Sequence, residues 1–215
     1  METNPFDGKV VVVMAADTRP GKAVALELAR CGATIAAHYR SSFETARSLV
    51  REIEGIGGFA VAFKADPVDP EQAESLCFRV HGALERIDLV VLNATRQAWT
   101  GDAPPAPRGP VELTGVLDTV RDRVLGCVAP AYAALPVMTG QGHGGVICLT
   151  GAGDGPPDLT DALVTNAVAT VLERLAGDPA AAAIPVETAV ADGPEAARLA
   201  RAWFGRPAEA APRVP

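Results

Sequence analysis

Short apolar runs alternate along the chain with longer segments in which apolar residues recur every three or four positions. The two periods match the side-chain spacing of strands and helices, so the runs predict strands and the longer segments predict helices. The predicted strands are residues 10–14, 33–38, 59–64, 87–92, 145–150 and 184–190. Most of these runs lack polar alternation, which is typical of parallel strands buried on both faces. We therefore expect an α/β fold with helices on both sides of a sheet of about six parallel strands.

The segment from Gly8 to Leu28 is the clearest of these units. Its strand ends at Met14, a polar turn follows, and Pro20 opens a helical pattern that continues to Arg30. Proline suits a first helical turn, where its missing N–H group would have no partner in any case. A strand, turn and helix of this kind normally begin a nucleotide-binding βαβ domain, because the positive end of the helix faces whatever lies above the turn.

The rest of the chain predicts one domain. Helical patterns cover Val111 to Met138 and Ala162 to Leu175, and both are apolar over more than one face, so they need burial on both sides. Residues 99–110 are rich in proline and glycine and predict a loop, and residues 195–204 predict a short helix. The length of 215 residues favours a single domain, residues 1–205, followed by a disordered tail, residues 206–215.

Composition excludes several classes of function. The net charge of -7, without a stripe of lysine and arginine, argues against a nucleic-acid partner. No apolar run reaches the length of a membrane span and the first residues lack the layout of a signal peptide, so we expect no membrane association and a cytoplasmic location. The four cysteines and three histidines are scattered, which predicts reduced thiols and no metal site.

Two motifs resemble those of the short-chain dehydrogenase/reductase family. The family's Thr-Gly-x-x-x-Gly-x-Gly turn falls on Met14, Ala15, Arg19 and Gly21, so that one of its three glycines is present. Its Asn-Asn-Ala-Gly motif falls on residues 92–95, where Asn93 and Ala94 match and Thr95 replaces the glycine. The likeness extends over nearly the whole chain. It implies a three-layer, Rossmann-like, doubly wound sheet that is C-terminally truncated relative to the family.

The resemblance carries over a weakened cofactor site. Arg19 stands where a glycine would let a pyrophosphate approach, and Thr95 crowds the cofactor floor. Three further positions match the family's cofactor contacts: Arg40 after the second strand, Asp66 after the third and Asn93 after the fourth. A basic residue at position 40 resembles the NADP type, although a solvated loop with Ser42 capping the next helix explains it equally well. We therefore expect no cofactor, or NADP(H) if a nucleotide is bound.

The family's catalytic residues are absent from these 215 residues. The resemblance implies a serine, a Tyr-x-x-x-Lys pair and a supporting asparagine, in which the tyrosine transfers a proton to the substrate carbonyl. In the best register these positions hold Gly151 preceded by Thr150, Asp161 and Thr165, and Arg123. Both tyrosines and all three lysines lie elsewhere, and no serine follows Ser75. The residue inventory therefore excludes a carbonyl reductase of the usual mechanism.

The replaced residues suggest other chemistry. If the family geometry holds, Asp161, Arg123, Thr150 and Thr165 gather near Asn93. The carboxylate would then serve as a general base and the guanidinium would stabilise an oxyanion. A structural reading stands beside this one for each residue. In that reading Asp158 caps a helix that has Asp161 in its first turn, and Arg123 is a solvated or interface residue.

Three functions remain open at this point. The first is a cofactor-independent enzyme, such as a cyclase, dehydratase or isomerase, acting on a small carbonyl or polyketide-like compound. The second is a catalytically silent subunit that pairs with an active homologue. The third is an NADP(H)-dependent oxidoreductase of unusual mechanism, and we rank it last because the losses at the cofactor turn and the proton relay are correlated. The two long helices pair between subunits in the resembled family, which implies a homodimer, a homotetramer or a hetero-oligomer.

Overall fold

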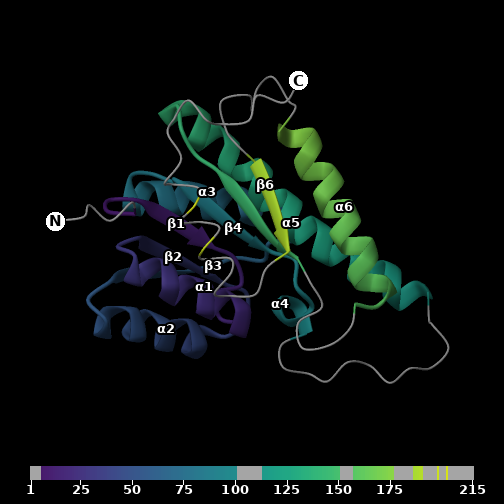
Figure 1. The fold of residues 1–215 in the computed structure, drawn as a ribbon, viewed down its shortest axis with the longest axis horizontal. Helices are drawn as coiled ribbons and strands as arrows, with labels where there is room; N and C mark the ends of the chain where they lie inside the picture. The colour runs from purple at the N-terminus through teal and green to yellow at the C-terminus, as the bar shows by residue number, and fades with distance from the viewer. Residues whose placement is uncertain are drawn as a thin grey trace.

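The computed structural model describes residues 6–100, 113–150, 157–176 and 186–190, together with residues 198 and 202. Within these residues six parallel strands form one sheet in the order β3-β2-β1-β4-β5-β6 (Figure 1). The strands are β1 (Val10–Val13), β2 (Thr34–Tyr39), β3 (Phe59–Lys64), β4 (Leu89–Asn93), β5 (Val146–Thr150) and β6 (Val186–Val190). The predicted doubly wound parallel sheet is confirmed.

Helices cover both faces of the sheet, so the molecule has three layers (Figure 1). On one face α1 (Arg19–Arg30) and α2 (Phe43–Gly55) pack over one apolar core. On the other, α3 (Pro70–Leu84), α5 (Leu113–Gln141) and α6 (Leu159–Ala176) pack over a second core. A short helix, α4 (Arg96–Thr100), follows β4. The chain runs outward from β1 to β3 and then returns to β4 beside β1, which creates a topological switch point between β1 and β4.

The central strand shows why the apolar runs lack alternation. Val11 and Val13 of β1 belong to the core under α1 and α2, whereas Val10 and Val12 belong to the core under α3, α5 and α6. Both sets are buried. A strand between two helical layers has no solvent face, so its residues are apolar at every position.

Side-chain caps mark the starts of α2 and α3, and the predicted cap at Ser42 is confirmed. The hydroxyl oxygen of Ser42 accepts the N–H of Thr45 at 3.3 Å, and the carboxylate of Asp69 accepts the N–H of Glu71 at 3.0 Å. Pro70 then occupies the first turn of α3. These side chains bind N–H groups that have no partner within the helix, which fixes the point where each helix begins.

Several predicted boundaries are wrong. Trp99, predicted to begin a loop, lies in α4, and the following residues 101–112 lie outside the described part of the chain. The helix predicted at residues 162–175 begins earlier, at Leu159, because Asp158 caps it. The predicted tail at 206–215, and all but residues 198 and 202 of the helix at 195–204, also lie outside the described residues.

Helix α5 is the longest element and continues past the predicted end at Met138 to Gln141, with Pro130 and Pro136 inside it. By length and composition alone, Thr114–Gln141 is apolar enough to cross a membrane. It packs against α3, α6 and β4, as a core helix of a folded domain does. The second core therefore explains the apolar residues on its buried side, while others, such as Leu117 and Tyr132, are exposed.

A buried carboxylate ties together the amino-terminal ends of the central strands. Asp88 accepts the N–H of Val10 at 2.9 Å and two hydrogen bonds from Arg86, at 2.6 and 2.7 Å, and its Oδ1 lies 3.2 Å from His143 Nε2. Burial opposes its charge, but these contacts outweigh that effect and hold the pKa of Asp88 below its ordinary value. The side chains of Asp88, Arg86 and His143, at the amino-terminal end of β1 and β4, therefore pair with one another.

Candidate functional site

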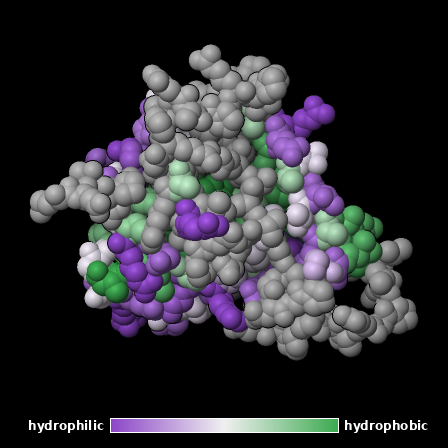
Figure 2. Space-filling view, viewed as in Figure 1, coloured by the Kyte–Doolittle hydropathy of each residue, from purple (hydrophilic) through white to green (hydrophobic). Residues whose placement is uncertain are grey.

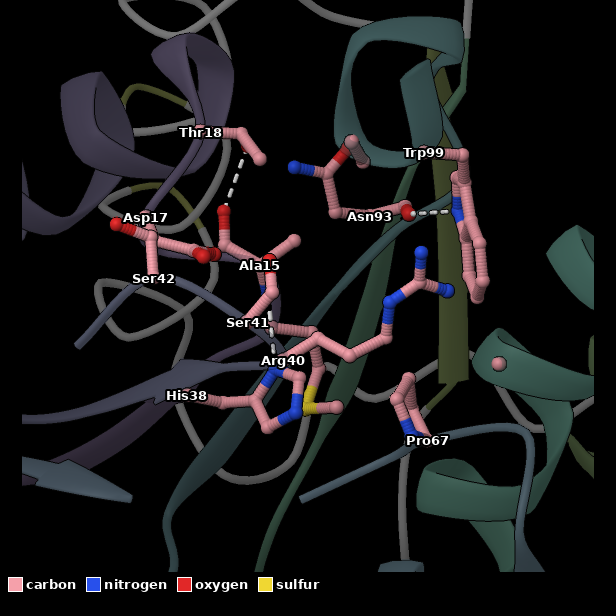
Figure 3. Close-up of a pocket in the computed structure, with 13 residues that line it drawn as sticks. Ala15, Asp17, Thr18, His38, Arg40, Ser41, Ser42, Pro67, Asn93 and Trp99 are labelled. Carbon is pink, nitrogen blue, oxygen red and sulfur yellow. Dashed lines mark hydrogen bonds between the residues drawn. The ribbon is translucent and has the colours of Figure 1, made fainter. Parts of the chain in front are cut away.

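A pocket of about 220 Å³ opens at the carboxyl ends of β1, β2 and β4, at the switch point of the sheet (Figure 3). Crevices at this place in doubly wound sheets are where ligands bind. The lining residues come from the ends of strands, the loops that follow them, α4 and α5: Met14, Ala15, Asp17, Thr18, His38, Arg40, Ser41, Ser42, Pro67, Asn93, Ala98, Trp99 and Gly126.

The turn between β1 and α1 forms one side of the pocket. Ala15 adopts a left-handed conformation, with φ of 50°, and its carbonyl oxygen accepts the hydroxyl of Thr18 at 2.6 Å. That oxygen lies 2.1 Å from the place where a Cβ on residue 21 would be, so Gly21 is required for α1 to approach the turn. Arg19 is exposed and does not line the pocket. The predicted obstruction of this pocket by Arg19 is therefore wrong, because Arg19 is not among the residues that line it.

His38, on β2, holds this turn in place through hydrogen bonds. The N–H of Ala15 donates to His38 Nδ1 at 3.1 Å, which leaves the ring proton on Nε2, and Nε2 donates to the carbonyl of Ala65 at 3.1 Å. The backbone carbonyl of His38 also accepts the N–H of Ala16 at 2.8 Å. Burial lowers the pKa of His38 to about 4, so the imidazole is neutral at physiological pH.

Asn93 places an amide on the pocket wall. Its Oδ1 accepts the N–H of Thr95 at 3.3 Å and the hydroxyl of Thr95 at 2.7 Å. Its Nδ2 is buried and has no acceptor within the described part of the chain. Thr95 turns its hydroxyl to Asn93 and does not line the pocket, so the predicted crowding of the floor by Thr95 is also wrong. A buried amide without an acceptor is unfavourable unless a ligand or water supplies one.

Arg40 and Trp99 meet across the pocket, as Figure 3 shows. The Arg40 guanidinium carbon lies 5.2 Å from the centroid of the indole, within the range of a cation–π contact. The indole N–H donates to the backbone carbonyl of Asn93 at 3.3 Å. Asp66, predicted to line the site with Arg40, does not line this pocket, and its Oδ1 instead accepts the N–H of Val68 at 3.2 Å.

The predicted catalytic residues lie outside this pocket. Arg123 and Asp161 do come together, with Arg123 Nη1 donating to Asp161 Oδ1 at 2.9 Å, and Arg123 Nη2 donating to the carbonyl of Ala94 at 2.6 Å. Thr150 is buried at the end of β5, and Thr165 is half-buried on α6. None of these four side chains lines the pocket. The reading of Arg123 as a solvated residue is wrong, because only 2% of it is exposed.

Asp161 is held by two arginines. Besides Arg123 of α5, Arg96 of α4 donates to its Oδ2, and Arg96 also lies 3.3 Å from Asp158. The N–H of Asp161 donates to Asp158 Oδ1 at 2.9 Å, which confirms the predicted helix cap. Burial opposes the charge of Asp161, yet the arginines and the Asp158 N–H hold its pKa below the ordinary value. Catalysis by Asp161 stays a prediction, and the geometry gives this carboxylate a bracing role between three helices.

A family model described as short chain dehydrogenase matches residues 9–156, which include the β1–α1 turn and Asn93. The chain belongs to the short chain dehydrogenase family. Proteins of this family commonly act on small molecules and form oligomers.

Relatives of this short chain dehydrogenase chain include an L-rhamnose 1-dehydrogenase (NAD(P)(+)) of Sphingomonas sp. (strain SKA58). It is 33% identical over 142 residues, which are 66% of this chain and 54% of that protein. A hydroxynaphthalene reductase of Aspergillus fumigatus is 40% identical over 90 residues, which are 42% of this chain and 33% of that protein. A crystal structure of a short-chain type dehydrogenase/reductase from Mycobacterium marinum has a TM-score of 0.74 at 25% identity, covering 88% of this chain and 76% of that chain.

These comparisons correct the predicted function. The relatives are named as dehydrogenases and reductases, so the expectation of a cofactor-independent cyclase, dehydratase or isomerase, or of a silent subunit, is wrong. The chain spans about half or less of the length of these two relatives.

The sequence did not point to two residues of the pocket, His38 and Trp99, or to Arg96 in the ion-pair group beside it. His38 ends an apolar strand and could have been recognised as a buried histidine between two strand ends. Trp99 was placed in a loop because proline and glycine follow it. Arg96 carries no sequence signal, since its partners Asp158 and Asp161 are more than sixty positions away.

Stability should fall as the pH is lowered from about 6.5 to about 4. The unfolded chain binds a proton at His38 near pH 6.5 and the folded chain only near pH 4, so acid in this window favours unfolding. At pH values below about 4 the loss in the free energy of unfolding that follows from this pKa shift is about 3 kcal/mol. Urea unfolding of the wild type and of His38→Asn across this window would measure it. The variant should show the smaller pH dependence, and equal slopes would contradict the assignment.

Replacing Asp161 by Asn should lower the free energy of unfolding by about 3 kcal/mol, because two arginines would lose a buried partner. Asp118→Asn is the matched control, since Asp118 pairs with Arg121 on the exposed surface of α5 and should have little effect. Chemical denaturation of both variants measures the difference. Asp161→Asn as stable as Asp118→Asn, but without turnover of a substrate, would support the catalytic reading instead.

Proposed function

We propose that this chain binds NADP(H) and is an oxidoreductase of the short chain dehydrogenase family. The observation that carries the proposal is the pocket at the switch point, where the Asn93 amide lacks an acceptor and the Arg40 side chain enters from the loop after β2. An amide N–H without an acceptor calls for a ligand oxygen. A basic residue after β2 suits the 2′-phosphate of NADP(H).

The residues present fit a dinucleotide. The backbone N–H groups at the start of α1 would face the pyrophosphate, and Gly21 lets that helix approach the turn closely. Arg40, Ser41 and Ser42 would hold the phosphorylated ribose. Asp17 also lines the pocket, where burial raises its pKa above the ordinary value. A bound nicotinamide would supply or accept a hydride.

The proton that accompanies the hydride needs a source other than the family's tyrosine. Within these 215 residues no Tyr-x-x-x-Lys pair exists. Asp161, which stands in the tyrosine's position, is paired with Arg96 and Arg123 and does not line the pocket, so its contacts give it a bracing role. We propose a small hydroxy or carbonyl compound as substrate, in line with the sugar and hydroxynaphthalene in the names of the relatives.

We also propose that α5 and α6 form a subunit interface in a cytoplasmic oligomer. Both helices expose large apolar side chains, and Figure 2 shows hydrophobic surface on the side where α6 lies. Exposed apolar patches of this kind mark interaction sites. The exposed residues are Leu117, Leu125 and Tyr132 on α5, and Leu159 and Leu163 on α6.

NADPH should bind to the wild type in calorimetric titration, and about ten times more weakly to Arg40→Ala, because one phosphate contact is lost. NADH binding should not weaken. Arg47→Ala, which removes the same charge from the exposed surface of α2, is the control and should bind NADPH as the wild type does. No binding of NADPH to the wild type would refute the proposal.

Light scattering should give the mass of an oligomer, and Leu117→Glu should reduce that mass because a charge would enter the apolar interface. Phe78→Glu on α3 is the matched control, since Phe78 is comparably exposed but lies on another helix. A monomeric wild type, or equal masses for both variants, would rule out the proposed interface.

A further inference from the structure

The indole of Trp99 fits into a notch on α5. A Cβ at position 126 would lie 2.2 Å from Trp99 Cη2 and 2.3 Å from Cζ2, so the absence of a side chain at Gly126 makes room for the ring. The same point lies 3.5 Å from Pro67, in the loop after β3. Figure 3 shows Trp99 and Pro67 at the same side of the pocket, with the Arg40 side chain reaching toward them.

This notch lies on the side of the pocket where the base of a dinucleotide would go. The pyrophosphate belongs at the start of α1, and the ribose of the adenosine half reaches the loop after β2. The loop after β3, which contains Pro67, is the next loop along the sheet because β3 pairs with β2. A base attached to that ribose would therefore lie toward Pro67. The slot between Pro67 and Gly126 has room for one flat ring because position 126 carries no side chain. In this chain the ring in the slot is the protein's own.

Two contacts hold the indole there. Its Nε1 donates to the carbonyl of Asn93 at 3.3 Å, and the guanidinium of Arg40 lies over its face at 5.2 Å. Helix α4, which carries Trp99, is tied to α6 by the ion pairs of Arg96 with Asp158 and Asp161. The backbone is therefore fixed, and the indole can leave the slot by rotation of its own side chain.

We propose that Trp99 occupies the base position of the nucleotide site and that Arg40 acts as its latch, an inference that rests on the proposed binding of NADP(H). Any dinucleotide must displace the indole before its base can enter the slot. This displacement lowers the affinity of the protein for the nucleotide. A 2′-phosphate gives Arg40 a new partner in place of the ring, whereas the unphosphorylated ribose of NAD(H) does not. The contact between Arg40 and Trp99 therefore lowers the affinity for NAD(H) more than the affinity for NADP(H).

Calorimetry with NADP⁺ and NAD⁺ tests the base position. Trp99→Ala should bind both nucleotides about five-fold more tightly than the wild type, because neither has to displace a ring. Trp99→Phe keeps a ring without the N–H donor and should fall between the two. Trp203→Phe is the control for loss of a tryptophan, since Trp99 and Trp203 are the two tryptophans of the sequence.

A double-mutant cycle isolates the latch. Arg40→Ala should tighten NAD⁺ binding in the wild-type background and leave it unchanged in the Trp99→Ala background, where the latch has nothing to hold. Arg40→Ala should weaken NADP⁺ binding in both backgrounds. An equal effect on NAD⁺ in both backgrounds would overturn the role of Arg40 as a latch.

Fluorescence gives a readout that is independent of activity. In a Trp203→Phe protein, Trp99 is the remaining tryptophan. Saturation with 2′,5′-ADP should shift its emission to longer wavelength and increase quenching by iodide, because the indole moves into solvent. Unchanged emission despite bound 2′,5′-ADP would overturn the displacement.

The outcomes separate this proposal from the one it rests on. Weaker nucleotide binding by Trp99→Ala would overturn displacement and show that the base stacks on the indole. Unchanged binding would overturn the gate and leave the proposed NADP(H) site standing. Absence of binding to both the wild type and Trp99→Ala would overturn the proposed function, and the gate with it.

Discussion

The two hydrogen bonds of the His38 imidazole hold the ends of three strands in one arrangement, and the pocket depends on that arrangement. One bond reaches the end of β1 at Ala15 and the other the end of β3 at Ala65, while His38 itself lies on β2. Only the neutral ring can accept at Nδ1 and donate at Nε2 at the same time. The left-handed conformation of Ala15, which gives the turn its shape, is held by this bond and by the hydroxyl of Thr18.

The polar residues at the carboxyl end of the sheet form two separate groups. Asn93 and Arg40 line the pocket, whereas Arg123 and Asp161 are buried beside it. The two groups adjoin at the end of β4, where Ala94 accepts hydrogen bonds from Arg123. Arg123 and Asp161 pair with each other because a buried charge without a partner is far less stable than a paired one. The pair therefore leaves neither charge facing the pocket.

The fold could be predicted from the sequence to a large extent, because apolar periodicity reports burial directly. The six strands, the cap at Ser42 and the glycine at position 21 all follow from local patterns. The site was harder, since its geometry depends on contacts between distant positions. Arg96 with Asp161 and Arg40 with Trp99 are pairs that no local pattern reveals.

The direction of side chains is a second property of the site that the sequence does not predict. Arg19 and Thr95 occupy positions where a side chain could block a nucleotide, but neither residue lines the pocket. The hydroxyl of Thr95 turns to Asn93, and Arg19 is exposed at the first position of α1. A substitution in a motif changes a site only if the new side chain enters it, which the sequence alone does not show.

The pairing of Arg123 with Asp161 also restricts how this protein can change over generations. Replacement of either residue alone would strand a charge in the interior and lower stability by about 3–5 kcal/mol, a large part of what a typical domain possesses. A lineage that needed a different residue at position 161 would have to alter position 123 at nearly the same time. The ion pair therefore tends to be retained in evolution, since the single variants that would precede its replacement are poorly folded.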